Sequence, residues 1–570
     1  MKFCQLTYLA LSCGFAIFLS TSPVQAQMGG GTSEIFRLDG SQTWEAFGSA
    51  VASAGDVNGD GTPDFIIGST VYDNGAIINA GAARVYSGVD SSLLYEYIGA
   101  SQAESLGRSV AGLGDVDLDG FDDFIISSPY SVDGGGILRG SATVYSGATG
   151  MPIYVIVNPS PDPPFARLVS AAGDVNGDGQ PDFMIAVPEA NPGGIHSAGS
   201  VFLYSGATGQ VIYQIDGTEQ TDYLGSGISE AGDIDGDGFD DFIIGSEGAD
   251  STLVRNSGVA TVYSGFDLSI LFQFSGEEVS QRMGSAVTGN QDVNGDGIPD
   301  FMIGASGWSR GFGNAQGSVY VFSGSSGERL FRFRGQSPVA MLGQVISFAG
   351  DLDRDGYADF FFGSPNNSSG GIEAGGLGTL FSGATGNLIH TFSGEIAFDR
   401  VGSSFASLGD IDGNGFSDFV LGINGVNQST GAASVLSFDP YLTTSAYRLS
   451  RSTGGTVTIN IDFPDAEANA QYGLLLSRTG AESSGFRGGT IPLVQDALFQ
   501  QVAGGWTPPF MSNNFGTLDA YGNAAASFTL LPNSPLALID TRRWFAAVTL
   551  VPGSGDMSTA SIAVPLKIIP

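Results

Sequence analysis

The sequence predicts an all-β protein in which one four-stranded unit is repeated seven times. Three observations lead to this prediction. A nine-residue acidic loop begins at Asp56 and returns at a constant interval of 59 residues until the copy that begins at Asp410. Each loop lies between a run of small residues and an apolar run, as Ser49–Gly55 and Phe65–Gly68 show in the first copy. Glycine, which permits tight turns, occurs 87 times, whereas only 14% of the residues are charged.

The first copy shows how the unit is built. The acidic loop and the apolar strand are followed by a variable stretch, Ser69–Ala80, then by a strand that ends in a Ser-Gly turn at Gly88, and finally by Leu93–Ile98. These are four short strands separated by Gly, Asp, Asn and Ser turns. Seven such units favour a seven-bladed β-propeller, because radial stacking leaves only short strand edges exposed.

The two ends of the repeat region indicate that the ring closes on itself. The seventh copy ends with Ser434–Phe438 and has no fourth strand after it. An unassigned strand, Glu34–Leu38, precedes the first copy and is similar to fourth strands such as Leu330–Phe333. We therefore predict that the N-terminal strand completes the last blade, which a linear solenoid would not require.

The acidic loop has the ligand pattern of a calcium site. In the first copy, Asp56–Asp64, side-chain oxygens occupy positions 1, 3, 5 and 9, and Gly61 stands at position 6, where the chain must turn sharply. Thr62 at position 7 would supply its backbone carbonyl. Hard oxygen donors at this density favour calcium over magnesium, which tends to keep several waters. A structural role is expected, because the ion would neutralise crowded carboxylates and rigidify the loop.

The same pattern recurs in all seven copies, so we expect up to seven calcium ions. Copies 1, 3 and 5 carry Asn at position 3 and Pro at position 8, whereas copies 2, 4 and 6 carry Asp and no Pro, which suggests duplication of a two-repeat unit. Asn replaces the position-5 carboxylate in the seventh copy, which predicts the weakest site. The candidate metal ligands are Asp56, Asn58, Asp60, Thr62, Asp64, Asp115, Asp117, Asp119, Phe121, Asp123, Asp174, Asn176, Asp178, Gln180, Asp182, Asp233, Asp235, Asp237, Phe239, Asp241, Asp292, Asn294, Asp296, Ile298, Asp300, Asp351, Asp353, Asp355, Tyr357, Asp359, Asp410, Asp412, Asn414, Phe416 and Asp418.

The charge balance excludes some partners. Acidic residues outnumber basic residues 58 to 21, which gives a formal net charge of −37, and 24 of the acids lie at ligand positions of the loops. Nucleic acids and anionic membranes are therefore not expected as partners, since both require a basic surface.

Residues 1–26 have the features of a secretory signal peptide. Lys2 is followed by the apolar stretch Leu6–Leu19 and by a small-residue cleavage pattern that ends at Ala26. The apolar stretch is too short to predict a transmembrane segment. Both cysteines, Cys4 and Cys13, lie in this segment, so a mature secreted or cell-surface chain would lack disulfides. Calcium would then stabilise the fold in place of disulfides.

The remaining regions are a short linker, 27–33, and a C-terminal domain, 440–570, which follows the repeat region 34–439. The 59-residue period is lost after Pro440, and the chain instead alternates apolar and polar residues in runs such as Thr456–Ile461 and Trp544–Leu550. This pattern predicts a small antiparallel β-sandwich.

Residues 34–439 resemble the FG-GAP repeats of the integrin alpha-subunit headpiece and of many secreted bacterial proteins. The resemblance rests on Phe47-Gly48 and on Gly81-Ala82-Ala83, with an acidic loop between them, in a sevenfold register. It implies a seven-bladed propeller with calcium in the loops between first and second strands, and a role in extracellular recognition or as a scaffold. Integrins carry such loops in only some blades. The resemblance does not carry over integrin ligands, because no partner-subunit or leg-domain features are present.

The stretches between the second and third strands vary between copies and should lie on the face opposite the metal loops. Exposed aromatic residues beside Arg are typical of recognition surfaces. Trp308 and Arg310 are the strongest candidate pair. The full set of candidate ligand-face residues is Tyr72, Tyr130, Arg139, His196, Arg255, Trp308 and Arg310.

The sequence favours a non-enzymatic protein that binds an extracellular protein or glycan. The mature chain has only two histidines, His196 and His390, and no glycine-flanked nucleophile elbow. Two alternatives stay open. One is a polysaccharide-active lyase or hydrolase that uses acids and Arg on the non-metal face, and the other is a structural envelope or matrix protein.

Overall fold

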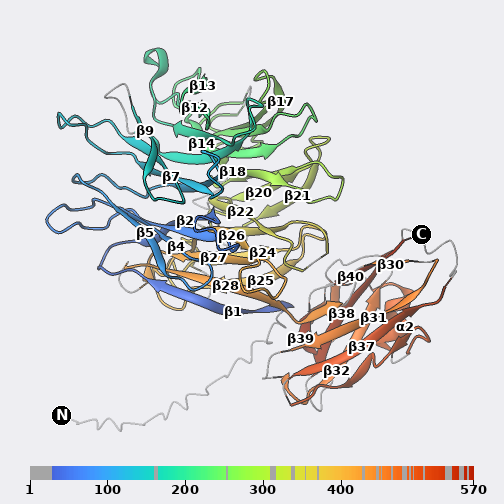
Figure 1. Ribbon diagram of the computed structural model, residues 1–570. Coiled ribbons are helices and arrows are strands. Elements are labelled where there is room, and N and C mark those ends of the chain that lie inside the picture. Colours follow the sequence, from blue (N-terminus) through green and yellow to red (C-terminus); the bar gives the residue numbers. More distant parts are fainter. Residues whose placement is uncertain are drawn as a thin grey trace, which may run out of the picture.

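The computed structural model (Figure 1) describes residues 28–569 with internal gaps. The gaps are 159–164, 252–253, 308–315, 336–339, 354, 369–370, 427–429, 445–447, 451, 464–466, 478–483, 487–488, 492, 494, 505–506, 521, 533–541, 551–556 and 562–563. The predicted signal peptide lies outside the described residues.

Within this part of the chain, six antiparallel sheets have four strands each, in sequence order. Blade 1 consists of β2 (Phe47–Gly55), β3 (Asp64–Ser69), β4 (Ala82–Tyr86) and β5 (Leu93–Ile98), and blade 2 of β6 (Val110–Gly114), β7 (Asp123–Ser128), β8 (Ser141–Tyr145) and β9 (Pro152–Val157). Blade 3 consists of β10 (Leu168–Gly173), β11 (Asp182–Val187), β12 (Ser200–Tyr204) and β13 (Val211–Asp216), with a 3-10 turn η1 (Pro192–Gly194). Blade 4 consists of β14 (Leu224–Gly232), β15 (Asp241–Ser246), β16 (Val259–Tyr263) and β17 (Ile270–Ser275). Blade 5 consists of β18 (Met283–Gln291), β19 (Asp300–Ala305), β20 (Ser318–Phe322) and β21 (Arg329–Arg334), and blade 6 of β22 (Val345–Gly350), β23 (Asp359–Ser364), β24 (Leu377–Phe381) and β25 (Leu388–Ser393).

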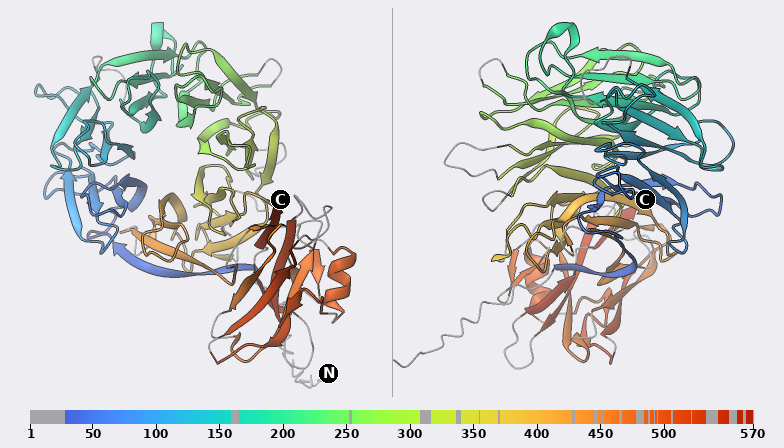
Figure 2. Two further views of the ribbon diagram at one scale, coloured as in Figure 1. Left: turned by 45° about the vertical axis from the view of Figure 1, so that its right-hand side comes forward. Right: turned by 90° about the vertical axis from the view of Figure 1, so that its left-hand side faces the viewer.

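The seventh blade joins the two ends of the repeat region. It consists of β26 (Val401–Gly409), β27 (Asp418–Ile423), β28 (Ala432–Pro440) and the N-terminal strand β1 (Met28–Asp39). β1 pairs antiparallel with β28, with Glu34 opposite Leu436 and Asp39 opposite Ala432, which confirms the predicted ring closure. Figure 2 shows the blades arranged around a ring, with the blue N-terminal strand beside the orange last blade. The predicted linker is corrected, because β1 begins at Met28 and not at Glu34.

The core of each blade lies on its second strand. β3 is buried at every position, whereas the outermost strand, β5, keeps several exposed residues. Apolar side chains of neighbouring blades pack together, as Ile66 and Val85 of blade 1 do in one cluster with Phe124 of blade 2. A fully buried side chain of this size contributes about 1.5–3 kcal/mol. These apolar seams therefore hold the blades side by side.

Among the described residues, the C-terminal region forms two larger sheets, a two-stranded sheet of β33 and β34, and the helix α2. One sheet has the order β29-β31-β37-β35, and the other contains β39, β38, β32 and β36, with β40 and β30 at its side. Val457 and Phe528 of the first sheet share one apolar cluster with Leu474 and Phe545 of the second. The elements are β29 (Leu442–Thr444), β30 (Arg448–Ser450), β31 (Gly455–Asp462), β32 (Gln471–Ser477), β33 (Ser484–Phe486), β34 (Gly489–Ile491), α2 (Ala497–Ala503), β35 (Met511–Ser512), β36 (Phe515–Thr517), β37 (Asn523–Leu530), β38 (Arg542–Leu550), β39 (Met557–Ser561) and β40 (Val564–Ile569).

The N-terminal strand also connects the two regions. The first residues of β1 pair in parallel with β39, with Met28 opposite Ala560 and Gly29 opposite Ser561. β1 therefore belongs both to the last blade and to a C-terminal sheet (Figure 1). None of the helices in the described ranges is long and apolar enough to cross a membrane.

Candidate metal centres

All seven acidic loops lie at the same end of their blades. Each loop leaves the first strand of a blade and enters the second, as β2 ends at Gly55 and β3 begins at Asp64. Since the strands alternate in direction, the turns between third and fourth strands lie at this end too. The connections between second and third strands lie at the other end. The ring therefore has one acidic face and one face built from the variable connections.

Backbone amides hold the first loop carboxylate in place. In the first copy, Gly61 N donates to Asp56 Oδ2 at 2.8 Å, and Asp60 N donates to Asp56 Oδ1 at 3.0 Å. The bond from the position-6 glycine to the position-1 carboxylate is present in all seven loops. The glycine at position 6 has a positive φ of 87° at Gly61, which explains why this residue type recurs there.

Backbone amides also orient the side chains at positions 3 and 5. Asp60 N donates to Asn58 Oδ1 at 2.9 Å, and Thr62 N donates to Asp60 Oδ1 at 2.9 Å. Both bonds recur in every loop. The backbone of the position-7 residue, whose carbonyl is a predicted ligand, is therefore tied to the position-5 side chain. In the seventh loop Asn414 Oδ1 accepts this bond from Phe416 N at 2.7 Å, so an amide can replace the carboxylate in this part of the scaffold.

The closing carboxylate at position 9 connects two turns. Asp64 is fully buried, accepts from Val57 N through Oδ2 at 3.0 Å and accepts from Gly88 N through Oδ1 at 2.9 Å. The first bond recurs in all seven loops, and the second recurs in blades 1 to 6. This carboxylate thus fastens the acidic loop to the Ser-Gly turn after the third strand, a contact that the sequence analysis missed.

The same contact explains the recurring Ser-Gly turn. A Cβ atom at Gly88 would lie 2.1 Å from the carbonyl oxygen of Pro63, which is a forbidden approach. A Cβ atom at Gly147, Gly206 or Gly324 would lie 1.9 to 2.0 Å from the corresponding carbonyl oxygen. The turn can therefore reach the closing carboxylate only where the side chain is missing.

Burial without a cation makes these carboxylates difficult to ionise. Burial, assisted by neighbouring carboxylates, raises the pKa of Asp64 and Asp123 to about 6 and the pKa of Asp182 and Asp241 to about 7. Burial also raises the pKa of Asp359 well above its ordinary value. A bound cation would reverse this effect by stabilising the ionised form.

The structure brings three carboxylates together in four of the loops. In the second loop, one oxygen each of Asp115, Asp117 and Asp123 lies within 4.8 Å of the others, and equivalent groups occur in loops 4 and 7. In loop 6 the group consists of Asp351, Asp353 and Asp355. The donor set contains oxygen and no sulfur or imidazole, which fits a hard divalent cation such as calcium.

Loops 1, 3 and 5 differ because Asn occupies position 3. The Nδ2 of Asn58 donates to Asp64 Oδ1 at 3.3 Å, and the Nδ2 of Asn176 donates to Asp182 Oδ1 at 3.0 Å. This hydrogen bond reduces the repulsion between the carboxylates of the loop. The Oδ1 of the same Asn side chain accepts a hydrogen bond from the backbone N–H at position 5. These loops thus present one amide oxygen in place of a carboxylate.

The alternation between odd and even copies corresponds to pairs of loops that are hydrogen-bonded to each other. Asp56 N donates to Asp122 Oδ2 at 2.8 Å, and Asp122 N donates to Asp56 O at 3.2 Å. Loops 3 and 4 make the same two contacts through Asp240, and loops 5 and 6 make the backbone contact through Ala358. In loops 3 and 5 the equivalent position is proline, which has no N–H to donate. Loops 1, 3 and 5 are thus each bonded to the even loop that follows them.

The predicted ligand-face residues do not form one compact group. They lie in the connections between second and third strands of different blades, on the face opposite the acidic loops. The Tyr72 ring packs on the guanidinium of Arg84, and Arg139 pairs with Asp133 at 3.0 Å, so both have structural partners. Tyr130 is half-buried, whereas His196 and Arg255 are exposed. Trp308 and Arg310 lie outside the described residues.

The second histidine lies beside an aromatic side chain. His390 lies on the outer strand β25, and its ring centroid is 4.7 Å from that of Phe392.

Seven four-stranded blades with an acidic loop at the same end of each blade define the molecule as an all-β propeller protein. Comparison with known sequences then specifies its type. The FG-GAP repeat model matches residues 47–86, 166–204 and 283–322, which fall in blades 1, 3 and 5. Integrin alpha-V of Gallus gallus is 32% identical over 219 residues, covering 36% of this chain and 20% of the relative. Integrin alpha-5 of Xenopus laevis is 29% identical over 239 residues, covering 39% and 22%, respectively.

The chain therefore contains FG-GAP repeats in three of its blades and is similar to integrin alpha chains. Integrin alpha-IIb of Homo sapiens is similar as well, with 31% identity over 181 residues. The chain spans about a fifth of the length of these relatives.

Proposed function

We propose that this protein is a secreted, calcium-stabilised β-propeller that recognises an extracellular protein or glycan. One observation supports the proposal above the others. All seven loops hold their candidate ligand side chains on the same set of backbone amides, although the sequences between the loops differ. Up to seven calcium ions would bind in these loops.

Calcium is the ion that best suits this donor set. The loops offer several carboxylate and amide oxygens and a backbone carbonyl, which matches a shell of six to eight oxygen ligands. Magnesium demands a tighter octahedral shell and keeps several waters. The ions would serve the fold and not a reaction, because each one would neutralise buried carboxylates that fasten the loop to the neighbouring turn.

The mature chain would begin after the signal peptide 1–26 and consist of two domains. The propeller, 34–439, would be extended by the preceding residues of β1, and the C-terminal domain, 440–570, would be a β-sandwich. The two C-terminal sheets and the apolar cluster that they share support the sandwich.

Recognition would occur on the face opposite the metal loops. Adhesion is a reasonable role because the relatives named above are integrin alpha chains. Two alternatives remain for testing: a polysaccharide-active lyase or hydrolase on the same face, and a structural envelope or matrix protein. Turnover of a glycan would support the enzyme, and self-assembly without a ligand would support the matrix protein.

The test combines metal counting, thermal unfolding and a binding screen on residues 27–570. We expect close to seven calcium ions per chain, a large fall in melting temperature after chelation, and recovery when calcium is restored but weaker recovery with magnesium. A screen of immobilised glycans and extracellular proteins should then give binding without product release. A melting temperature that does not respond to chelation would contradict the calcium part of the proposal. Product release would contradict the recognition part.

A further inference from the structure

Blade 5 carries an unusual concentration of positive charge on its outer strand. β21 has the sequence Arg329-Leu330-Phe331-Arg332-Phe333-Arg334, so three of the 21 basic residues of the chain fall within six positions. In a protein with a net charge of −37, such a cluster is not explained by the general charge balance.

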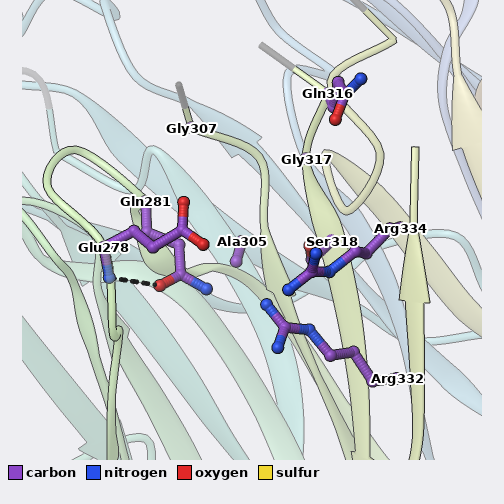
Figure 3. Close-up of a pocket in the computed structure, with 9 residues that line it drawn as sticks. All are labelled: Glu278, Gln281, Ala305, Gly307, Gln316, Gly317, Ser318, Arg332 and Arg334. Carbon is purple, nitrogen blue, oxygen red and sulfur yellow. Dashed lines mark hydrogen bonds between the residues drawn. The ribbon is translucent and has the colours of Figure 1, made fainter. Parts of the chain in front are cut away.

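Two of these arginines point into a pocket at the non-metal end of the blade. Figure 3 shows the guanidinium groups of Arg332 and Arg334 directed into the same space, with Glu278 and Gln281 on the opposite wall. Gln316 and Ser318 complete its polar lining. The cavity measures about 70 Å³ and is partly open, so it can enclose a carboxylate group while the rest of a ligand lies at its mouth. Its lining includes Gly307, which follows β19, Gln316, which precedes β20, and Glu278 and Gln281 of the connection that enters the blade.

The equivalent place in blade 1 is filled by an internal ion pair. Arg84 donates from Nη1 to the fully buried Glu45 and from Nε to Glu96, each at 2.8 Å. Four periods of 59 residues further on, these three positions are Tyr320, Gln281 and Arg332. The cross-strand register is the same, since Arg84 lies opposite Glu96 and Tyr320 lies opposite Arg332. Blade 5 thus has neither of these carboxylates, and its arginine lies on the outer strand.

The arginine of blade 5 is incompletely paired. The Nε–H of Arg332 is buried and donates to no acceptor among the described residues. Its nearest carboxylate, Glu277, is 3.8 Å away from Nη1, and the Glu277 side chain is 66% exposed. A surface pair of this kind contributes little. Gln281 cannot act as a counter-ion, because it is neutral and its Nε2 donates to Tyr320 Oη at 2.6 Å.

The remaining groups restrict the chemistry of a ligand. A planar carboxylate can accept two parallel bonds from a guanidinium. Glu278 lines the same pocket and would repel a doubly charged sulfate or phosphate more strongly than a carboxylate with one charge. Glu278, Gln316 and Ser318 can accept from or donate to hydroxyl groups beside that carboxylate.

We propose that this pocket binds an acidic sugar residue, with Arg332 and Arg334 on its carboxylate and the opposite wall on its hydroxyl groups. The proposal rests on the proposed recognition function and names a ligand class and a place for it. A single uronate unit fits this description, whereas a peptide carboxylate lacks the adjacent hydroxyl groups.

The test uses calorimetric titration of the calcium-loaded chain with methyl glucuronide at millimolar concentration, and with methyl glucoside as the neutral sugar. We expect the glucuronide to bind and the glucoside not to bind. Arg332→Gln and Arg334→Gln should each weaken binding roughly tenfold or more, because each removes a charge-assisted contact. Arg37→Gln is the matched control: Arg37 occupies the equivalent position of blade 7, pairs with Asp39, and should leave affinity unchanged.

A second variant separates charge from folding. Gln281→Glu keeps the size of the side chain and its acceptance of the Glu277 and Glu278 amides, but it gives Arg332 an internal carboxylate. It should therefore weaken glucuronide binding while the melting temperature is maintained. Absence of glucuronide binding, or folded Arg332→Gln and Gln281→Glu chains that bind as tightly as the wild type, would overturn the proposal. Tighter binding of sulfate or of N-acetyl-glutamate methylamide would overturn the assignment to an acidic sugar. If the same variants still bound a ligand found in the glycan and protein screen, the recognition function would stand without this pocket.

Discussion

The buried ion pair of blade 1 gives a quantitative prediction, because blade 5 contains a natural replacement for it. The perturbation is Arg84→Tyr, which installs the residue of blade 5 and leaves Glu45 without its counter-ion. Glu45 is fully buried and still accepts from Gln42 N at 2.9 Å and from Ser69 Oγ at 3.1 Å. These neutral donors only partly compensate for the lost guanidinium.

The expected magnitude follows from the contacts that disappear. Arg84 makes two charge-assisted bonds of 2.8 Å, and its side chain is only 9% exposed. Removal of one partner of a buried ion pair costs about 3–5 kcal/mol. Because Glu96 is 39% exposed and can be solvated again, we expect the lower end, about 3 kcal/mol. The double variant Glu45→Gln with Arg84→Tyr recreates the Gln–Tyr pair of blade 5 and should recover about 2 kcal/mol of this loss.

Hydrogen exchange of β4 amides, followed by mass spectrometry, measures the local opening free energy in a chain of this size. A loss of about 3 kcal/mol corresponds to exchange roughly a hundredfold faster, since about 1.4 kcal/mol is a factor of ten. The double variant should exchange only a few times faster than the wild type. If the double variant exchanged as fast as Arg84→Tyr, or faster, the two positions would not be coupled, and the comparison of blades 1 and 5 would be refuted.

Two predictions concern the metal loops. Asp123→Asn should remove one calcium ion per chain and lower the melting temperature, because the side-chain amide has only one oxygen to accept from Val116 N and Gly147 N. Asp119→Asn should retain the fold and only weaken calcium binding, since Asn414 already occupies the equivalent position in loop 7. Equal calcium counts in the two variants would contradict this difference. The second prediction is that the metal-free chain becomes less stable as the pH rises. Burial raises the pKa of the closing carboxylates to about 6–7, so the folded chain binds more protons than the unfolded chain. Its melting temperature in chelator should therefore be highest below about pH 4 and fall as the pH rises through 7. Calcium should remove most of this fall, and a rise with pH in chelator would contradict the reasoning.

Much of the fold could be predicted because the signals are local and repeated. A constant interval fixes the number of blades, and a missing fourth strand at one end together with an extra strand at the other predicts how the ring closes. The start of β1 could not be predicted. Residues 28–31 are methionine and glycines, which have no strand pattern, and their pairing depends on β28 and β39, which follow several hundred residues later.

The candidate sites were predictable to a similar extent. Ligand positions follow from spacing within nine residues, but the contact between Asp64 and Gly88 joins residues 24 positions apart and becomes visible only when the hairpin is folded. The arginines of β21 are visible in the sequence. The incomplete pairing of Arg332 is not visible there, because it depends on the neutral Gln281, which lies in the connection that enters the blade.

The loop pairs also imply that the ring is not equally strong all around. Loops 1, 3 and 5 are each bonded to the even loop after them, but an ideal Cβ at Gly409, before the seventh loop, would meet no atom within 4 Å. Pro63, at position 8 of loop 1, has no N–H with which to bond loop 7. The seam between the last and first blades contains the hydrogen bond from Ser404 Oγ to Gly48 O at 2.8 Å and an apolar cluster that includes Phe65 and Val420. The chain closes the ring because β1, which precedes blade 1, pairs with β28 of blade 7. Ring closure therefore uses the N-terminal strand at a seam that lacks the hydrogen bond found between loops 1 and 2.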